Sequence, residues 1–240
     1  MPTQAQEIHV GVKGGVSIPQ LSGSDDNELS RDYKSRLAPN FGAFVDIALN
    51  ERLSFQTEAN YAGQGGKRLG IQPISQPPAN LPPLPAGSYY YANFDNVAKL
   101  TYLEVPAMLK YKFGKKDTKR VFVNGGVYYG RLLSAETETS GSSTLYFDRD
   151  GKIPFLLPPN GTPLPPIPFD AVTDVKNDIR NNNFGLTGGG GLEIPHGKNY
   201  VVFDARISYG LISIQRDTVR NGDSKTGGFV ISVGYAFGVK

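Results

Sequence analysis

The chain has 240 residues with 29 glycines, 18 prolines, 13 tyrosines, 13 phenylalanines and no cysteine. The lack of cysteine excludes a disulfide framework and a thiolate metal site. A net charge of +3 is too small to indicate a nucleic-acid partner. No run of about 18 apolar residues occurs, which excludes a transmembrane helix, and a composition rich in glycine and aromatic residues favours β-sheet.

Apolar and polar residues alternate from the start of the chain. Ile8, Val10 and Val12 fall on one parity, whereas His9 and Lys13 fall on the other. A period of two predicts an extended strand, because successive side chains point to opposite faces. The pattern recurs and predicts eight strands, at about residues 7–19, 40–50, 52–63, 98–113, 120–133, 183–194, 199–213 and 227–238.

The fourth of these segments, Lys99–Gly114, reads KLTYLEVPAMLKYKFG and shows the alternation most clearly. One face is apolar throughout, and the other carries Glu104 and two lysines. Because Pro106 has no N–H to donate, we expect a bulge or a local distortion there. Segment 120–133 has aromatic residues on both parities, so its facing is open at this stage.

Short and long connections alternate strictly between the predicted strands. The short ones are NER, GKKDTK and PHGKN, and the long ones run over about 20–38, 65–96, 134–181 and 215–226. An up-and-down barrel with tight periplasmic turns at one rim and long extracellular loops at the other predicts this pattern. Both termini then lie on the periplasmic side. The opening MPTQAQE lacks the apolar core of a signal peptide, so we expect the leader to have been removed.

Two of the long loops hold thirteen of the 18 prolines, in IQPISQPPANLPPLPAG and KIPFLLPPNGTPLPPIPFD. Such segments favour extended backbone and cannot join a sheet interior. They are therefore interpreted as stiff surface loops, and as candidates for binding an extracellular protein or glycan. The sequence does not say whether they are ordered.

Charged side chains within the strands gather on the parity opposite to the apolar one. They are Lys13, Asp46, Glu58, Glu104, Lys110, Lys112, Glu193, Asp204 and Arg206. A basic side chain facing lipid near the midplane costs about 2–4 kcal/mol, whereas charges of both signs can pair inside a narrow barrel. We therefore predict that the apolar parity faces lipid and that these nine side chains form an ion-pair network in the lumen.

A soluble, lipocalin-like barrel is the inverse arrangement, with its apolar parity inside. Alternation within one strand serves both arrangements equally. The strict alternation of loop lengths and the aromatic residues near the strand ends favour the membrane barrel.

The stretch YLEVPAMLKYKFG (residues 102–114) resembles the Y-L-E-[IV]-P-x-x-[LM]-K-Y-x-F segment of the PorT-like outer-membrane β-barrel family, common in Bacteroidetes. Further matching pieces are GVKGGV, FQTEANYAGQGG, VNGGVYYGRLL and GYAFGVK. The resemblance implies an exported, eight-stranded outer-membrane barrel that occupies residues 1–240 as a single domain. It also implies an accessory role in protein export as a candidate function.

Catalytic chemistry finds little support in the sequence. The two histidines, His9 and His196, are both predicted at the periplasmic end. Glu58 and Glu104 could form an acid–base pair, but the basic residues on the same face favour salt bridges instead. We predict no catalytic residue, no cofactor and no metal site.

The predicted function is that of a non-enzymatic, monomeric barrel embedded in the lipid bilayer of the outer membrane. It is structural in the envelope or binds a partner through its extracellular loops. A narrow channel or porin is the first alternative, and a soluble ligand-binding barrel is the second.

Overall fold

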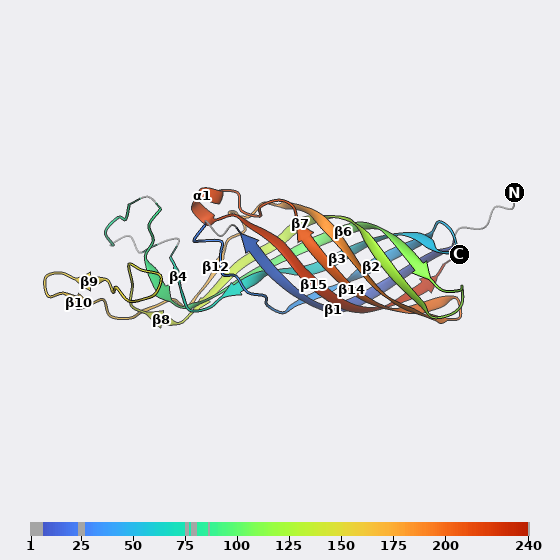
Figure 1. Ribbon diagram of the computed structural model, residues 1–240, viewed down its shortest axis with the longest axis horizontal. Coiled ribbons are helices and arrows are strands. Elements are labelled where there is room, and N and C mark those ends of the chain that lie inside the picture. The colour runs from blue at the N-terminus through green and yellow to red at the C-terminus, as the bar shows by residue number, and fades with distance from the viewer. Residues whose placement is uncertain (1–6, 24–26, 75–76, 78–80, 86, 240) are drawn as a thin grey trace.

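The computed structural model describes residues 7–23, 27–74, 77, 81–85 and 87–239. Long antiparallel strands close into an eight-stranded ring, which confirms the predicted barrel (Figure 1). In order round the ring they are β1 (Ile8–Gly23), β2 (Ala38–Ala48), β3 (Leu53–Arg68), β6 (Asp95–Phe113), β7 (Arg120–Ser140), β13 (Asn182–His196), β14 (Asn199–Gly210) and β15 (Ser224–Gly238). Pairing of β15 with β1 completes the ring.

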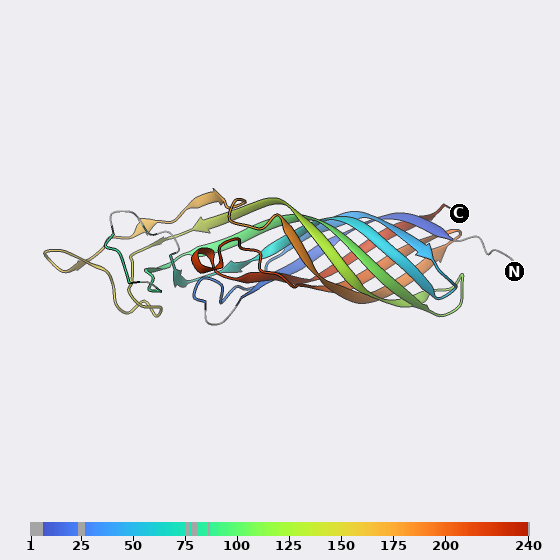
Figure 2. The ribbon, with the colours of Figure 1, turned by 90° about the horizontal axis from the view of Figure 1, so that it is seen from above.

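The strands cross the barrel obliquely (Figure 2). The stagger of the ring is found by following paired residues from strand to strand. The path starts at Val10 on β1, passes Val45 and Thr57, and reaches Gly227 on β15. Gly227 pairs with Gln20 on β1, ten residues further along than Val10. For eight strands this stagger corresponds to a tilt of roughly 40°. A barrel of this size has an interior that side chains can fill.

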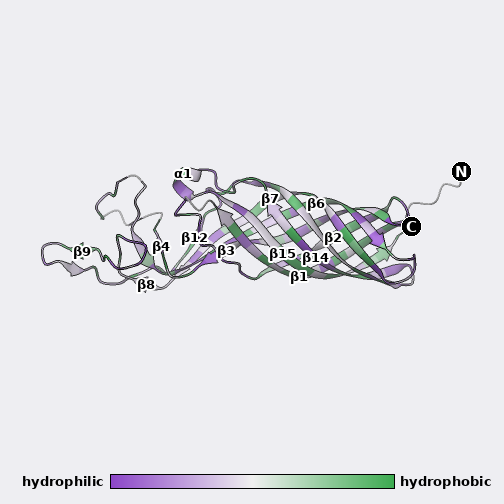
Figure 3. Cartoon of the chain, viewed as in Figure 1, coloured by the Kyte–Doolittle hydropathy of each residue, from purple (hydrophilic) through white to green (hydrophobic). Residues whose placement is uncertain are grey.

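The apolar parity faces outward and the charged parity faces inward. Figure 3 shows hydrophobic and hydrophilic residues interspersed along the same strands. On β6, Leu103 and Leu109 are 41% and 55% exposed, whereas Glu104 and Lys110 are 9% and 1% exposed. A continuous apolar belt round the outside fits a lipid environment and not water. The soluble, lipocalin-like alternative is therefore excluded.

The facing of β7, which the sequence leaves open, is settled in the same way. Val121 and Val123 are exposed on the outside, and Phe122 and Tyr128 are buried in the lumen. Phe122 lies against a glycine of the neighbouring strand β13, which leaves room for its ring.

Short and long connections lie at opposite ends of the barrel. Residues 49–52, 114–119 and 197–198 make three tight turns at one end, which we call the turn rim. The first and last strands meet at the same end, where His9 pairs with Gly238. The four long connections lie at the other end, the loop rim (Figure 1).

At the loop rim several strands continue past their predicted ends. Strand β3 reaches Arg68 instead of residue 63, and β7 reaches Ser140 instead of residue 133. The apolar alternation stops where β7 leaves the apolar belt, since Glu136 and Thr137 need not face lipid. The sequence pattern therefore marks the membrane-spanning part of each strand and not its end.

The loops contain further short elements. They are β4 (Ile71–Pro73), β5 (Tyr91–Asn93), β8 (Ser142–Ser143), β9 (Leu156–Leu157), β10 (Thr162–Pro163), β11 (Ile167–Pro168), β12 (Ala171–Asp174) and α1 (Thr218–Asn221). Strand β12 pairs with the outer end of β7, and the others form two-stranded ladders, β4 with β5, β8 with β11 and β9 with β10. Their prolines sit in ladders with free edges, where the missing N–H is tolerated. Among the described residues, no helix is long and apolar enough to cross a membrane.

The distortion predicted at Pro106 is present in a milder form. Pairing between β3 and β6 stops at Thr57 and resumes at Asn60, so the ladder passes over the proline. Thr57 Oγ1 donates a hydrogen bond to the main-chain oxygen of Pro106 (3.0 Å). The register shift on β6 lies elsewhere, between Thr101 and Tyr102. The predicted bulge is thus displaced toward the loop rim.

Candidate functional site

Buried charges fill the lumen in two clusters. The turn-side cluster consists of Asp46, Lys110, Lys112, Arg120 and Glu193. Lys110 Nζ lies 3.0 Å from Asp46 Oδ2 and 2.6 Å from Glu193 Oε1. Lys112 Nζ contacts the same two carboxylates at 3.2 and 3.4 Å, and Arg120 Nη2 lies 3.1 Å from Glu193 Oε2. Sequence reasoning missed Arg120, because this residue begins its strand directly after a turn rich in exposed lysines.

The central cluster consists of Lys13, Glu58, Asp204 and Arg206. Glu58 accepts from both terminal nitrogens of Arg206 (2.9 and 3.1 Å), and Lys13 Nζ lies 2.6 Å from the same carboxylate. Arg206 Nη2 also donates to Asp204 Oδ2 (2.9 Å). All four residues are buried. Close, bidentate geometry of this kind offsets the cost of removing the charges from water.

Glu104 is the exception among the nine predicted lumen charges. Its carboxylate accepts a hydrogen bond from Gln64 Nε2 (2.8 Å). No basic group in the described part of the chain lies within 4.0 Å of it, so the expectation of an ion pair does not hold for this residue. A cavity of about 30 Å³ separates Glu104 from the central cluster, with Lys13 and Arg206 on its wall. This volume has room for one or two water molecules.

Replacing Glu104 by glutamine is expected to leave the free energy of unfolding unchanged or to raise it by up to about 2 kcal/mol. The amide keeps an acceptor for Gln64 and removes a buried charge that has no cationic partner within the described ranges. Urea unfolding in lipid vesicles measures the change. A loss above about 1 kcal/mol would show instead that the carboxylate balances a charge of the central cluster.

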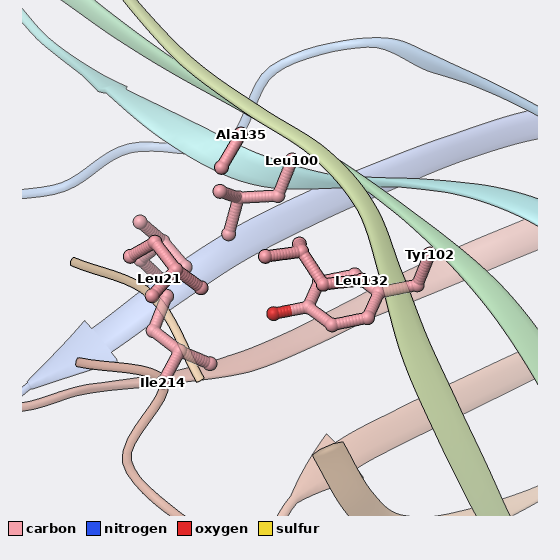
Figure 4. Close-up of a cluster of buried hydrophobic side chains, with 7 residues drawn as sticks. Leu21, Leu100, Tyr102, Leu132, Ala135 and Ile214 are labelled. Carbon is pink, nitrogen blue, oxygen red and sulfur yellow. The ribbon is translucent and has the colours of Figure 1, made fainter. Parts of the chain in front are cut away.

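Apolar side chains close the lumen at the loop rim (Figure 4). This plug consists of Leu21, Leu100, Tyr102, Leu132, Ala135, Ile179 and Ile214. Strands β1, β6 and β7 supply the first five, and two of the long loops supply the isoleucines. The loops therefore bring side chains over the barrel mouth and seal it from above.

A second apolar layer lies near the turn rim. It is formed by Phe44, Phe122, Tyr200, Val202 and Ala236. Lys110 Nζ lies 4.2 Å from the centre of the Phe122 ring, which is a cation–π contact. The turn-side cluster is thus packed against aromatic rings, and the interior has apolar layers at both ends.

The two proline-rich loops share a core of their own beyond the barrel, and we call this part the head (residues 69–94 and 141–170). Its core consists of Ile74, Tyr90, Ala92, Phe94, Leu145 and Phe155, with Leu81, Leu84, Leu157, Leu164, Ile167 and Phe169 packed against it. The rings of Phe94 and Phe169 stack at 4.6 Å and join the two loops. Six residues of the first loop (75–76, 78–80 and 86) lie outside the described residues. The head lies at the far end of the molecule from the turn rim (Figure 1).

A pocket of about 390 Å³ opens at the turn rim between the tight turns. His9, Lys116, Lys198 and Tyr200 line it, and Glu7 forms an ion pair there with Lys116. The hydrogen bond from Lys116 lowers the pKa of the Glu7 carboxyl. His9 Nε2 lies 3.2 Å from the main-chain oxygen of Lys198.

The second histidine of the chain, His196, is exposed at the end of β13. No group of three or more His, Cys, Asp or Glu side chains that could hold a metal ion occurs in the described part of the chain.

Several solved structures are similar to the chain, and none of the curated protein sequences matches it. Ail of Yersinia pestis, in complex with the heparin analogue sucrose octasulfate, is 14% identical with a TM-score of 0.40, and the match covers 96% of this chain and 99% of Ail. Neisserial surface protein A is 10% identical with a TM-score of 0.41, covering 96% and 97%. OprG from Pseudomonas aeruginosa is 12% identical with a TM-score of 0.41, covering 96% of each chain.

A family model described as the outer membrane protein beta-barrel domain matches residues 4–216, which is most of the chain. The ring of eight strands, the apolar exterior and the polar lumen agree with this match. The chain therefore belongs to the outer membrane protein beta-barrel domain family of the bacterial outer membrane.

Proposed function

We propose that this protein is a closed, non-enzymatic barrel that holds a folded head above the membrane for binding a partner. One observation carries the proposal. The lumen is filled by buried ion pairs and lies between two apolar layers, while the loops beyond it have a core of their own. An open pore needs a water-filled lumen, and this arrangement favours display over transport.

The proposal places the turn rim, with both chain ends, in the periplasm and the head outside the cell. The rule that supports this orientation is that bacterial barrels have short periplasmic turns and longer external loops. Arg149 and Lys152 are exposed trypsin sites in the head. Trypsin added to intact cells is expected to cut there, and protection of the head until the cells are broken would reverse the orientation.

The head offers an apolar surface suited to a protein partner. Phe147, Ile153 and Leu156 are exposed on it, although their loop already has a core to bury such residues. Apolar side chains left on the outside of a packed unit mark contact sites. Multivalent glycans are a less suitable partner for this part of the surface, because they bind through hydrogen bonds.

The structure also suggests how to remove the head without breaking the ring. Phe169 N donates to Gly141 O (2.8 Å), and Phe94 N donates to Gly70 O (3.2 Å). The two ends of each loop are therefore close to each other where the loop leaves the barrel. Residues 71–93 and 142–168 can each be replaced by a two-residue Asn-Gly turn.

The shortened variant is expected to keep the mobility shift on boiling that a closed barrel shows in detergent gels, and to lose binding to cells or matrix proteins. A second variant, the full-length protein with Phe147, Ile153 and Leu156 changed to serine, keeps the loop length and is also expected to lose binding. Equal binding by the shortened and full-length proteins would disprove the display function.

The narrow-channel alternative makes a different prediction in planar bilayers. Full-length protein is expected to give no current steps above background, because Arg206 and Glu58 close the middle of the lumen. Steps that change their ion selectivity in an Arg206→Gln variant would establish the channel instead.

The likeness of Tyr102–Gly114 to the PorT-like segment supports a place for the chain within that group and among the Bacteroidetes. An accessory role in protein export rests on this likeness alone. A deletion strain that secretes its proteins normally would remove that role and leave the display function untouched.

A further inference from the structure

We propose that an exposed basic face at the loop rim binds the phosphate groups of anionic lipids in the adjacent leaflet. This basic face consists of Arg131, Lys176, Arg180 and Arg216, all of which are exposed. The inference depends on the membrane location of the barrel, and not on the proposed function of the head.

A series of contacts joins the four residues into one patch. Arg131 Nη1 donates to Asn182 Oδ1 (2.9 Å) on the neighbouring strand. The preceding residue, Asn181, accepts a hydrogen bond from Arg216 Nη2 through its Oδ1 (3.2 Å). Lys176 Nζ donates to the main-chain oxygen of Leu133 (2.6 Å), two residues along β7 from Arg131.

Arg180, on the same loop as Lys176, joins the patch to the loop that carries Arg216. Its Nε donates to the main-chain oxygen of Gln215 (3.0 Å), next to Arg216. Arg216 Nε in turn donates to the main-chain oxygen of Ile179, next to Arg180 (2.9 Å). Each side chain is thus held in place while most of its donors stay open to solvent.

The basic face is held by neutral acceptors only. Within the described residues, no carboxylate lies within 4.0 Å of any of the four basic groups. Three acids are near in the chain. Asp174 Oδ1 accepts from the main-chain N of Lys176, and Asp217 Oδ1 accepts from the main-chain N of Val219 and of Arg220. Asp178 contributes its main-chain oxygen to the main-chain N of Arg216. Some other exposed basic residues at this end of the molecule do have carboxylate partners, as Lys99 has Glu138 and Arg149 has Asp32.

The basic face sits directly above aromatic side chains that face lipid. Tyr129 and Phe184 are exposed on the outside of the barrel with ring centres 5.1 Å apart. Tyr129 Oη donates to Asn182 Oδ1 (2.9 Å), the same oxygen that accepts from Arg131. Tyrosine rings of barrels lie at the level of the lipid headgroups, so this shared hydrogen bond places Arg131 at that level too.

A phosphate-bearing lipid fits both halves of this surface. Its phosphate matches the planar, multi-donor guanidinium groups of three arginines. Its acyl chains match the exposed Phe184 and Leu211 below them. A soluble anion would use only the first half, and an acidic protein would have to reach down to the membrane surface.

The test compares wild-type protein with an Arg131→Gln/Arg180→Gln variant in a non-ionic detergent. Each is titrated with bisphosphorylated lipid A, and native mass spectrometry counts the bound lipid. The double variant is expected to bind about tenfold more weakly, because two charge-assisted contacts to phosphate are lost. Dephosphorylated lipid A is expected to bind both proteins equally and weakly.

The matched control is Lys115→Gln/Lys119→Gln, which removes the same charge from exposed positions at the turn rim. It should bind lipid A as the wild type does. Equal weakening by both pairs would show a general charge effect and overturn the site, as would equal binding of the two lipid forms by wild type.

If the double variant lost its mobility shift on boiling, Arg180→Gln alone replaces it. Among the described residues, the Arg180 side chain makes a single hydrogen bond, to the main-chain oxygen of Gln215. An unchanged affinity in that folded single variant would also overturn the proposal.

Discussion

Replacing Glu58 by glutamine is expected to lower the free energy of unfolding by about 3–5 kcal/mol. Glu58 is the shared partner of Lys13 and Arg206 in the central cluster. Without its charge, two buried cations face the single carboxylate of Asp204. Urea unfolding in lipid vesicles, followed by circular dichroism, measures the loss.

Two further variants test whether the loss comes from the buried ion pairs of Glu58 and not from the removal of any carboxylate. Glu138 forms an exposed pair with Lys99 on the outside of the strands, and Glu138→Gln is expected to cost less than about 1 kcal/mol. Lys13→Met combined with Glu58→Gln removes one charge of each sign and is expected to recover more than half of the loss. A Glu58→Gln variant as stable as wild type would mean that water, and not Glu58, solvates the two cations.

A change of Gly191 to leucine is expected to prevent the barrel from closing. A Cβ at this position would overlap the main-chain oxygen of Phe203 on β14 and lie 2.6 Å from Cζ of Phe122. Overpacking of a filled interior typically costs about 1–3 kcal/mol. The cost is expected to be larger here, because the main-chain oxygen of Phe203 cannot move aside as a side chain could. We expect no mobility shift on boiling, and no folded fraction after refolding into detergent.

Gly188 provides the control, because it lies on the same strand but on the lipid-facing parity. The nearest atom to a Cβ there is Asn124 O at 3.4 Å, so Gly188→Ala is expected to change the free energy of unfolding by less than about 0.5 kcal/mol. Equal damage from both changes would mean that the strand needs glycine for its backbone conformation, and not for the space next to Phe122.

The barrel itself could be predicted from the sequence because its signal is local. Alternation along Lys99–Gly114 depends only on neighbouring residues. The two parities stay distinct because one faces lipid and the other faces a polar lumen. The strict alternation of short and long connections supplied the strand order. The strand ends were less accurate, as β7 shows, because the pattern ceases where the strand leaves lipid.

The partners of the lumen charges could not be predicted in the same way. Lys110 and Glu193 are far apart in sequence, and their contact depends on every register between β6 and β13. A stagger of ten residues round the ring decides which side chains share a level. This stagger brings Arg120 to Glu193 and, among the residues that the structure describes, leaves Glu104 without a basic partner.

By itself, then, the sequence of this protein determines eight membrane-spanning strands and the face that each turns to lipid, because both follow from the chemistry of adjacent residues. The tertiary structure alone decides which charges pair, how the plug closes the lumen, and that two proline-rich loops pack into one head. Each of these joins segments distant in the chain. Phe94 and Phe169, for example, stack because the pairing of β6 with β7 brings the ends of their loops together.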